Sequence, residues 1–143
     1  MIYHFKIHRE GKGYRAQGIE IPGCYTQGDS KKELEINMVE ALNLAVSEPV
    51  KSTDFVPLPD TKIEPSRSIA EVALDPKIAF SYWVRRCRNA HRWSQETTAS
   101  KMGFKSVYQY QRLESSKYNP TLNTLTLVKS VFPELSLDAL IEG

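Results

Sequence analysis

The stretch WSQETTASKMGF, residues 93–104, is followed by SVYQYQRLE, residues 106–114, and the pair reads as two short helices around a glycine corner. Ser94 can cap the first helix, because its hydroxyl can accept a hydrogen bond from a free backbone N–H of the first turn. Gly103 can adopt the positive φ that a sharp turn between two helices requires. The stretch therefore predicts a helix-turn-helix motif with its corner at Gly103.

The second helix of this motif carries side chains that suit the edges of base pairs. Tyr108, Gln111 and Arg112 are expected to point outward from it. Arginine pairs bidentately with guanine, glutamine pairs with adenine, and an aromatic ring can contact the methyl group of thymine. The motif therefore favours a DNA-binding protein, and the predicted base-reading residues are Val107, Tyr108, Gln111 and Arg112.

Phosphate contacts are predicted beside the same two helices. Gln95 opens the first helix, where exposed backbone N–H groups favour anions. Polar and basic side chains next to the second helix complete the set, so the predicted phosphate contacts are Gln95, Lys105, Ser106 and Lys117.

The charge of the chain is unevenly distributed around this motif. Residues 1–76 contain 9 basic and 12 acidic residues, a net charge of −3, whereas residues 77–133 contain 10 basic residues and only Glu96 and Glu114, a net charge of +8. A basic block that coincides with a helix-turn-helix pattern is what attraction to DNA phosphates requires. The charge pattern and the motif therefore support each other.

Composition indicates a globular protein, with 41% hydrophobic and 25% charged residues in 143. The sequence contains no apolar run that approaches the roughly 20 residues of a membrane span, and its first residues lack the layout of a signal peptide. We therefore expect a cytoplasmic protein without membrane contact. Cys24 and Cys87 are far apart and outside any Cys-x-x-Cys pair, so we expect two small core residues rather than a metal site.

The first half of the chain alternates between strand and turn patterns. Tyr3, Phe5 and Ile7 alternate with polar residues, which predicts a half-buried strand. Further strands are predicted over residues 14–21, with a bulge at Gly18, over 24–27 and over 68–74, the last pairing back into the same sheet. Ser30 and Glu33 form a capping box before a helix over residues 31–48, and the proline-rich residues 49–68 form a loop.

The second half is predicted to be helical. Asp75-Pro76 is a helix start, because aspartate is a good N-cap and proline is tolerated in the first turn. The first helix, residues 77–91, is expected to expose Arg85, Arg86 and Arg92. Helices over residues 95–102 and 106–115, one after Pro120, and a short one containing Leu137, Leu140 and Ile141 are predicted to follow. The sequence thus predicts an α+β protein with an α+β domain at 1–75 and an all-α domain at 76–143.

Residues 80–132 resemble the Xre family of Cro and phage-repressor helix-turn-helix domains. The match rests on Arg88, Ser94-Gln95, Ala99, Gly103, Leu113-Glu114, Pro120 and Leu125. The resemblance implies an ion pair between Arg88 and Glu114 that is structural. The turn through Phe104-Lys105-Ser106 is one residue longer than the family pattern, which leaves the register of the second helix open by one residue.

Residues 1–75 resemble the HicB antitoxin domain. The match rests on Gly13-Tyr14-Arg15-Ala16, the run from Ile21 to Asp29, Glu33, Glu40-Ala41-Leu42, and Phe55-Val56-Pro57-Leu58-Pro59. The resemblance implies a partial RNase H-like fold, a small HicA-like toxin that cleaves mRNA as partner, and repression of the protein's own operon through the DNA-binding half. The acidic balance of this half suits a basic partner, and Glu33 and Glu35 are the candidate toxin contacts.

Two other functions stay open for the first half. It can sense a small ligand for the same DNA-binding half, or it can cleave RNA. Nuclease chemistry needs carboxylates clustered around metal ions, but Glu10, Glu20 and Asp29 form no evident cluster, and His4 and His8 read as a solvated polar face. We therefore expect no catalytic residues, no metal and no cofactor.

A single helix-turn-helix reads few bases. We therefore expect a homodimer or higher oligomer on double-stranded operator DNA, with half-sites about 34 to 36 Å apart or a multiple of that. Leu137, Leu140 and Ile141 can supply the subunit interface or close the domain core.

Overall fold

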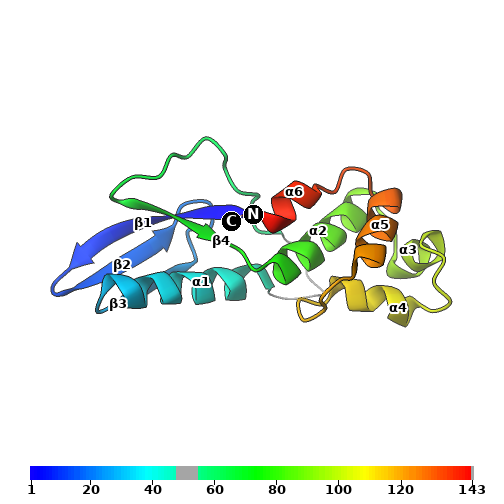
Figure 1. The fold of residues 1–143 in the computed structure, drawn as a ribbon, viewed down its shortest axis with the longest axis horizontal. Helices are drawn as coiled ribbons and strands as arrows, with labels where there is room; N and C mark the ends of the chain where they lie inside the picture. The colour runs from blue at the N-terminus through cyan, green and yellow to red at the C-terminus, as the bar shows by residue number, and fades with distance from the viewer. Residues whose placement is uncertain (48–54, 143) are drawn as a thin grey trace. The chain divides into compact units, whose positions relative to one another are not determined.

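The computed structural model describes residues 1–47 and 55–142, and this part of the chain divides into two compact units. The N-terminal unit comprises residues 1–47, 56–74 and 142, and the C-terminal unit comprises Phe55 and residues 75–141. Figure 1 shows the N-terminal unit as a sheet with one helix and the C-terminal unit as a group of helices. The protein is therefore α+β, as predicted. Within the described ranges, no helix is long and apolar enough to cross a bilayer.

The sheet of the N-terminal unit has four strands, all paired antiparallel in the order β3-β2-β1-β4. The strands are β1 (Ile2–Glu10), β2 (Gly13–Gly18), β3 (Tyr25–Gly28) and β4 (Ile69–Ala73). β4 pairs with β1, with Ala73 opposite Ile2 and Ile69 opposite Lys6. The prediction that the last strand returns to the first sheet is confirmed.

The predicted strand over residues 14–21 ends earlier than expected, and it has no bulge at Gly18. The backbone N–H of Gly18 donates to the carbonyl of Cys24 at 2.7 Å, and the N–H of Cys24 donates to the carbonyl of Ile21 at 2.9 Å. These bonds fold the chain into a tight loop directly after β2. A Cβ on Gly18 would lie only 2.5 Å from the Ile21 backbone oxygen. The loop backbone therefore passes so close to residue 18 that a glycine is needed there.

Helix α1 (Lys31–Ser47) covers one face of this sheet (Figure 1). Its first turn has half of the predicted capping box, because the Ser30 hydroxyl accepts from the Glu33 N–H at 3.1 Å. The Glu33 carboxylate accepts from the N–H of Asp29, one residue before the N-cap, at 3.0 Å. The residues that it buries are Leu34, Met38, Leu42 and Val46. Their spacing of four residues places them on one side of the helix, toward the sheet.

His4 is buried rather than solvated, which corrects the prediction for the polar face of β1. It is 4% exposed, and its Nδ1 lies 2.7 Å from a carboxylate oxygen of Glu20, which is buried as well. The other oxygen of Glu20 accepts from the backbone N–H of His4, and the Asp60 N–H reaches the same carboxylate at 3.1 Å. Glu20 therefore joins β1, the loop after β2 and the segment before β4.

The C-terminal unit consists of helices, two of which start at predicted caps. Asp75 accepts from the Lys77 N–H at 2.9 Å, and Ser94 accepts from the Thr97 N–H at 3.0 Å. A third cap, which was not predicted, is Thr121, whose hydroxyl accepts from the Thr124 N–H at 3.2 Å. The elements are α2 (Pro76–Ala90), α3 (Gln95–Lys101), α4 (Val107–Gln111), the 3₁₀ turn η1 (Arg112–Glu114), α5 (Leu122–Val131) and α6 (Leu137–Ile141).

Arg85 is the main departure from the predicted exposure of α2. It is 4% exposed, its guanidinium lies 5.8 Å from the ring centroid of Phe55, and burial lowers its pKa. Arg86 is half-buried and donates to the Tyr82 hydroxyl at 3.0 Å. Only Arg92 of the three arginines is exposed as expected, so part of the positive charge of α2 lies inside the unit.

Candidate nucleic-acid interface

Gly103 forms the corner between α3 and α4, with φ of +76°. The chain reverses here through hydrogen bonds from the Gly103 N–H to Ser100 at 3.0 Å and from the Phe104 N–H to Ala99 at 2.9 Å. An L-residue with a side chain would be strained at this φ. The predicted glycine corner is confirmed.

Helix α4 buries one face and exposes the other. Tyr110 and Leu113 are buried, whereas Tyr108 is 68% exposed and Gln111 and Arg112 are exposed three and four residues later. Residues at this spacing share one side of a helix. The structure therefore brings Tyr108, Gln111 and Arg112 together on the outer face of α4 and η1, while Val107 at the start of α4 is half-buried.

Gln109 fixes the start of α4, a role that sequence reasoning missed. Its side-chain oxygen accepts from the backbone N–H groups of Lys105 at 2.8 Å and Ser106 at 3.3 Å. Ser106 followed three residues later by a glutamine is a capping-box signature, so the signal was present in the sequence. The side chain of Lys105 and that of Ser106 are exposed beside this cap.

A buried carboxylate holds the helices of the motif together. Glu114 is 1% exposed, and the guanidinium of Arg88 donates hydrogen bonds to both of its carboxylate oxygens, at 2.6 and 3.2 Å. The hydroxyl of Tyr110 donates to the same carboxylate. Burial, together with the adjacent charge of Glu114, raises the pKa of Tyr110, so this hydroxyl stays a donor. The ion pair between Arg88 and Glu114 is confirmed.

Gln95 belongs to the same network. Its amide nitrogen donates to Glu114 at 3.1 Å, and its amide oxygen accepts from the side chain of Gln111 at 3.0 Å. The predicted phosphate contact therefore has its side chain engaged within the unit. Because it links the buried carboxylate to Gln111, Gln95 sets the orientation of one of the predicted base-reading side chains.

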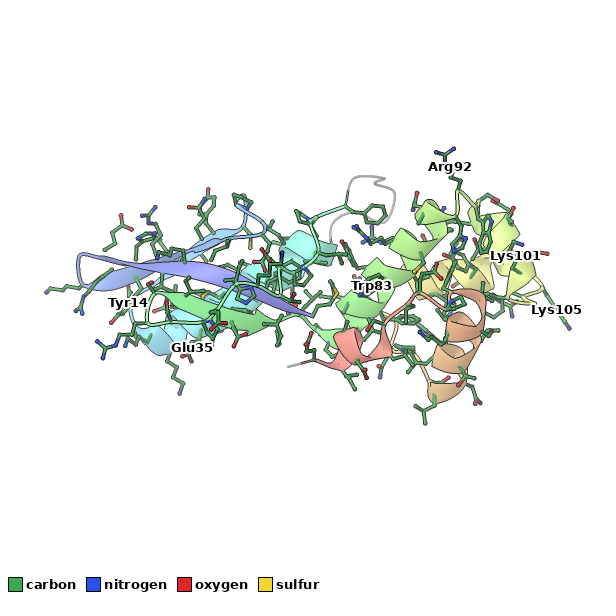
Figure 2. The ribbon with its side chains drawn as sticks, turned by 90° about the horizontal axis from the view of Figure 1, so that it is seen from above. Tyr14, Glu35, Trp83, Arg92, Lys101 and Lys105 are labelled. Atoms are coloured by element: carbon green, nitrogen blue, oxygen red, sulfur yellow. The ribbon has the colours of Figure 1, made fainter. Side chains whose placement is uncertain are left out.

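Several exposed cations surround the outer face of α4. The guanidinium of Arg112 lies 5.5 Å from the ring centroid of Tyr118, and the ammonium of Lys101 lies 4.5 Å from that of Trp93, so both are held over aromatic rings. Figure 2 shows Arg92, Lys101 and Lys105 around the α3 end of the unit. The exposed cations of this surface are Arg92, Lys101, Lys105, Arg112 and Lys117.

Other members of the basic block serve the interior of the unit. The ammonium of Lys129 donates to the carbonyls of Pro133 and Leu135, both at 2.6 Å. Arg85 is buried and Arg88 is paired with Glu114. The positive charge available to a ligand is therefore smaller than the net +8 of residues 77–133, and it is concentrated beside α3 and α4.

The two candidate toxin contacts lie on α1 and have different surroundings. Both side chains are exposed. Glu33 uses its carboxylate to accept from the Asp29 N–H at the start of the helix. Glu35 lines a cavity of about 420 Å³ together with residues of β1 and β2. Of the two, Glu35 is the one without a capping bond.

Both cysteines are buried, as predicted. Burial and the neighbouring charge of Glu134 raise the pKa of the Cys87 thiol to about 12, so it stays protonated near neutral pH. Burial also raises the pKa of Cys24. In the part of the chain that the structure describes, no group of three or more His, Cys, Asp or Glu side chains is arranged to hold a metal ion.

Comparison of the chain with protein-family models and with curated proteins finds no match.

Proposed function

We propose that the C-terminal unit binds double-stranded operator DNA with the outer face of α4 in the major groove. The observation that carries this proposal is the joint exposure of Tyr108, Gln111 and Arg112 on one side of a short helix. These are side chains that recognise base edges. The exposed cations beside α3 and α4 would hold the phosphates on either side.

The same proposal includes a homodimer or higher oligomer, because one such helix reads only a half-site. Leu140 of α6 is buried and closes the core of the unit, whereas Ile141 is 76% exposed. Leu137 is exposed as well, so the outer side of α6 offers apolar contact area to a second copy.

We further propose that the N-terminal unit neutralises a HicA-like toxin that cleaves mRNA, so that the whole protein is an antitoxin and autorepressor. The support is the resemblance of residues 1–75 to the HicB domain and the acidic balance of residues 1–76. Carboxylates on an antitoxin can cover a basic RNA-binding cleft and speed the association of the two proteins. Glu35 is the first residue to test as a contact.

Arg112→Ala is expected to weaken operator binding by about 1 to 3 kcal/mol and to relax the preference at one base position, because a bidentate contact to guanine is lost. Sites selected from a random pool by the parent and the variant would measure both effects. Lys105→Ala is the matched control. It should weaken binding to all sequences alike and reduce the salt dependence by about one counterion. If the selected sites are identical for Arg112→Ala and the parent, Arg112 does not read a base.

Co-expression with the product of the neighbouring reading frame tests the antitoxin role. We expect the full chain to restore growth and to co-purify with that product, and Glu35→Lys to weaken the complex through like-charge repulsion with a basic toxin. A chain that neither restores growth nor co-purifies would exclude the antitoxin role. The DNA-binding proposal would be unaffected, because it rests on the other unit.

A further inference from the structure

The N-terminal unit contains a cavity of about 420 Å³ at one end of its sheet. β4 pairs with β1 only as far as Lys6, whereas β1 continues beside β2 to Glu10. Beyond Lys6, the edge of β1 on this side has no paired strand among the described residues, although the Ile7 N–H still donates to the carbonyl of Ser68 at 2.7 Å. Ile7, Leu34 and Met38 provide an apolar floor to the cavity.

The rim of this cavity is positively charged. Arg9, Lys31 and Arg67 line it, and Glu35 is the carboxylate among the lining residues. The ion pairs found within residues 1–47 and 55–142 do not involve these three cations. Because residues 1–76 carry a net charge of −3, a positive rim runs against the overall charge of this part of the chain.

An aromatic side chain stands beside the cations. Tyr14 is directly opposite Arg9 in the antiparallel ladder, and the guanidinium of Arg9 lies 5.6 Å from the Tyr14 ring centroid. This contact holds the guanidinium at the cavity edge. Figure 2 shows Tyr14 and Glu35 on this unit, one from the sheet and one from α1.

We propose that this cavity binds a small organic anion, in which a carboxylate or phosphate group is carried on an apolar or aromatic body. The volume is within the range of about 300 to 1,000 Å³ that small-molecule sites occupy. The anionic group lies against Arg9, Lys31 and Arg67, whose charge-assisted hydrogen bonds to an anion are stronger than hydrogen bonds between neutral groups. The apolar body covers Ile7, Leu34 and Met38. This site would let the N-terminal unit respond to a metabolite, and it does not depend on the proposed toxin or operator binding.

The test uses the full chain labelled with ¹³C at its methionine methyl groups. Met38 lines the cavity, whereas Met102 lies in the C-terminal unit and serves as an internal reference. Benzoate and phenyl phosphate should each be titrated, with uncharged benzamide as the comparison. We expect a saturable shift of the Met38 signal, with Kd on the order of 1 mM or below for the better anion, and none with benzamide. The arm that binds more tightly identifies the anionic group as carboxylate or phosphate.

Variants of the rim have opposite expected effects. Arg9→Gln and Arg67→Gln should each weaken binding by about tenfold, whereas Glu35→Gln should tighten it severalfold because a repelling carboxylate is removed. Arg15→Gln is the matched control, since Arg15 points to the other face of the sheet and should leave the affinity unchanged. The proposal is overturned if neither anion shifts Met38 saturably, if benzamide binds equally well, or if both arginine variants bind as the parent does.

Discussion

Glu114→Ala is expected to lower the free energy of unfolding of the C-terminal unit by about 3 to 5 kcal/mol, the usual effect of removing one partner of a buried ion pair. The substitution would leave the guanidinium of Arg88, the hydroxyl of Tyr110 and the amide of Gln95 without their common acceptor. Urea unfolding followed by tryptophan fluorescence measures the change. Both tryptophans of the chain, Trp83 and Trp93, lie in this unit, so the signal reports on it alone.

Two further variants make this prediction decisive. Glu114→Gln keeps the shape and one acceptor oxygen, so it should lose less stability than Glu114→Ala and gives a value if the alanine variant does not fold. Glu96→Gln removes an exposed carboxylate from the first turn of α3 and should cost less than about 1 kcal/mol. A loss of less than about 1 kcal/mol in Glu114→Ala would show that the network does not hold the helices together.

Gly28→Ala is expected to destabilise the N-terminal unit by about 1 to 3 kcal/mol or more, because the new methyl group would overpack the contact between β3 and α1. A Cβ at this position would lie 2.7 Å from the backbone nitrogen of Leu34 and 2.9 Å from its Cα. Backbone atoms of a helix cannot rotate away as a side chain can. The loss can be followed through the methyl signal of Met38 during urea unfolding, because Met38 is buried in the same helix.

Gly23→Ala is the matched control for this prediction. Its Cβ would meet nothing within 4 Å, and its φ is in the ordinary range. Replacing such a glycine reduces the freedom of the unfolded chain, so the variant should be unchanged or more stable by about 0.4 to 1 kcal/mol. Equal stability of Gly28→Ala and Gly23→Ala would contradict the close contact at Gly28.

Local chemistry predicted the elements of this fold well. The caps at Ser30, Asp75 and Ser94 and the corner at Gly103 depend only on neighbouring residues, and the structure confirms each of them. The return of the last strand to the first sheet was also predicted, because a strand that follows a helix and a long connection needs a partner. The structure shows that this partner is β1. Helix caps and turns can be predicted from sequence because their hydrogen-bond partners lie within a few residues of each other along the chain.

Burial of charged residues was not predicted, because the partners come from distant parts of the sequence. Nothing near His4 in the sequence indicates that Glu20 folds back onto it from the loop after β2. Arg85 was expected to be exposed because charged residues seldom lie inside a protein unless they are paired. The hydrogen bonds of the Gln95 side chain to Glu114 and Gln111 were missed for the same reason. These two partners become neighbours of Gln95 only when α3 packs beside α4 and η1.

The candidate sites likewise divide into one that neighbouring residues form, which was predicted, and one that distant segments form, which was not. The outward direction of Tyr108, Gln111 and Arg112 was predictable from helical spacing alone. The cavity rim was not, because Arg9, Lys31 and Arg67 lie on three separate segments that only the sheet and α1 bring to one edge. A site assembled from distant segments leaves no local motif.

The pairing of β1 with β4 also orders events during synthesis. Within the N-terminal unit β1 is made before the other strands, yet β4, which pairs with it from Ile2 opposite Ala73 to Lys6 opposite Ile69, is the last strand of the unit to be made. Until then β1 presents unpaired backbone groups that can recruit another chain. The helices of the C-terminal unit, by contrast, form mostly from near neighbours and can assemble quickly. A newly made chain is therefore expected to be open to proteases and chaperones at β1 until β4 has been translated.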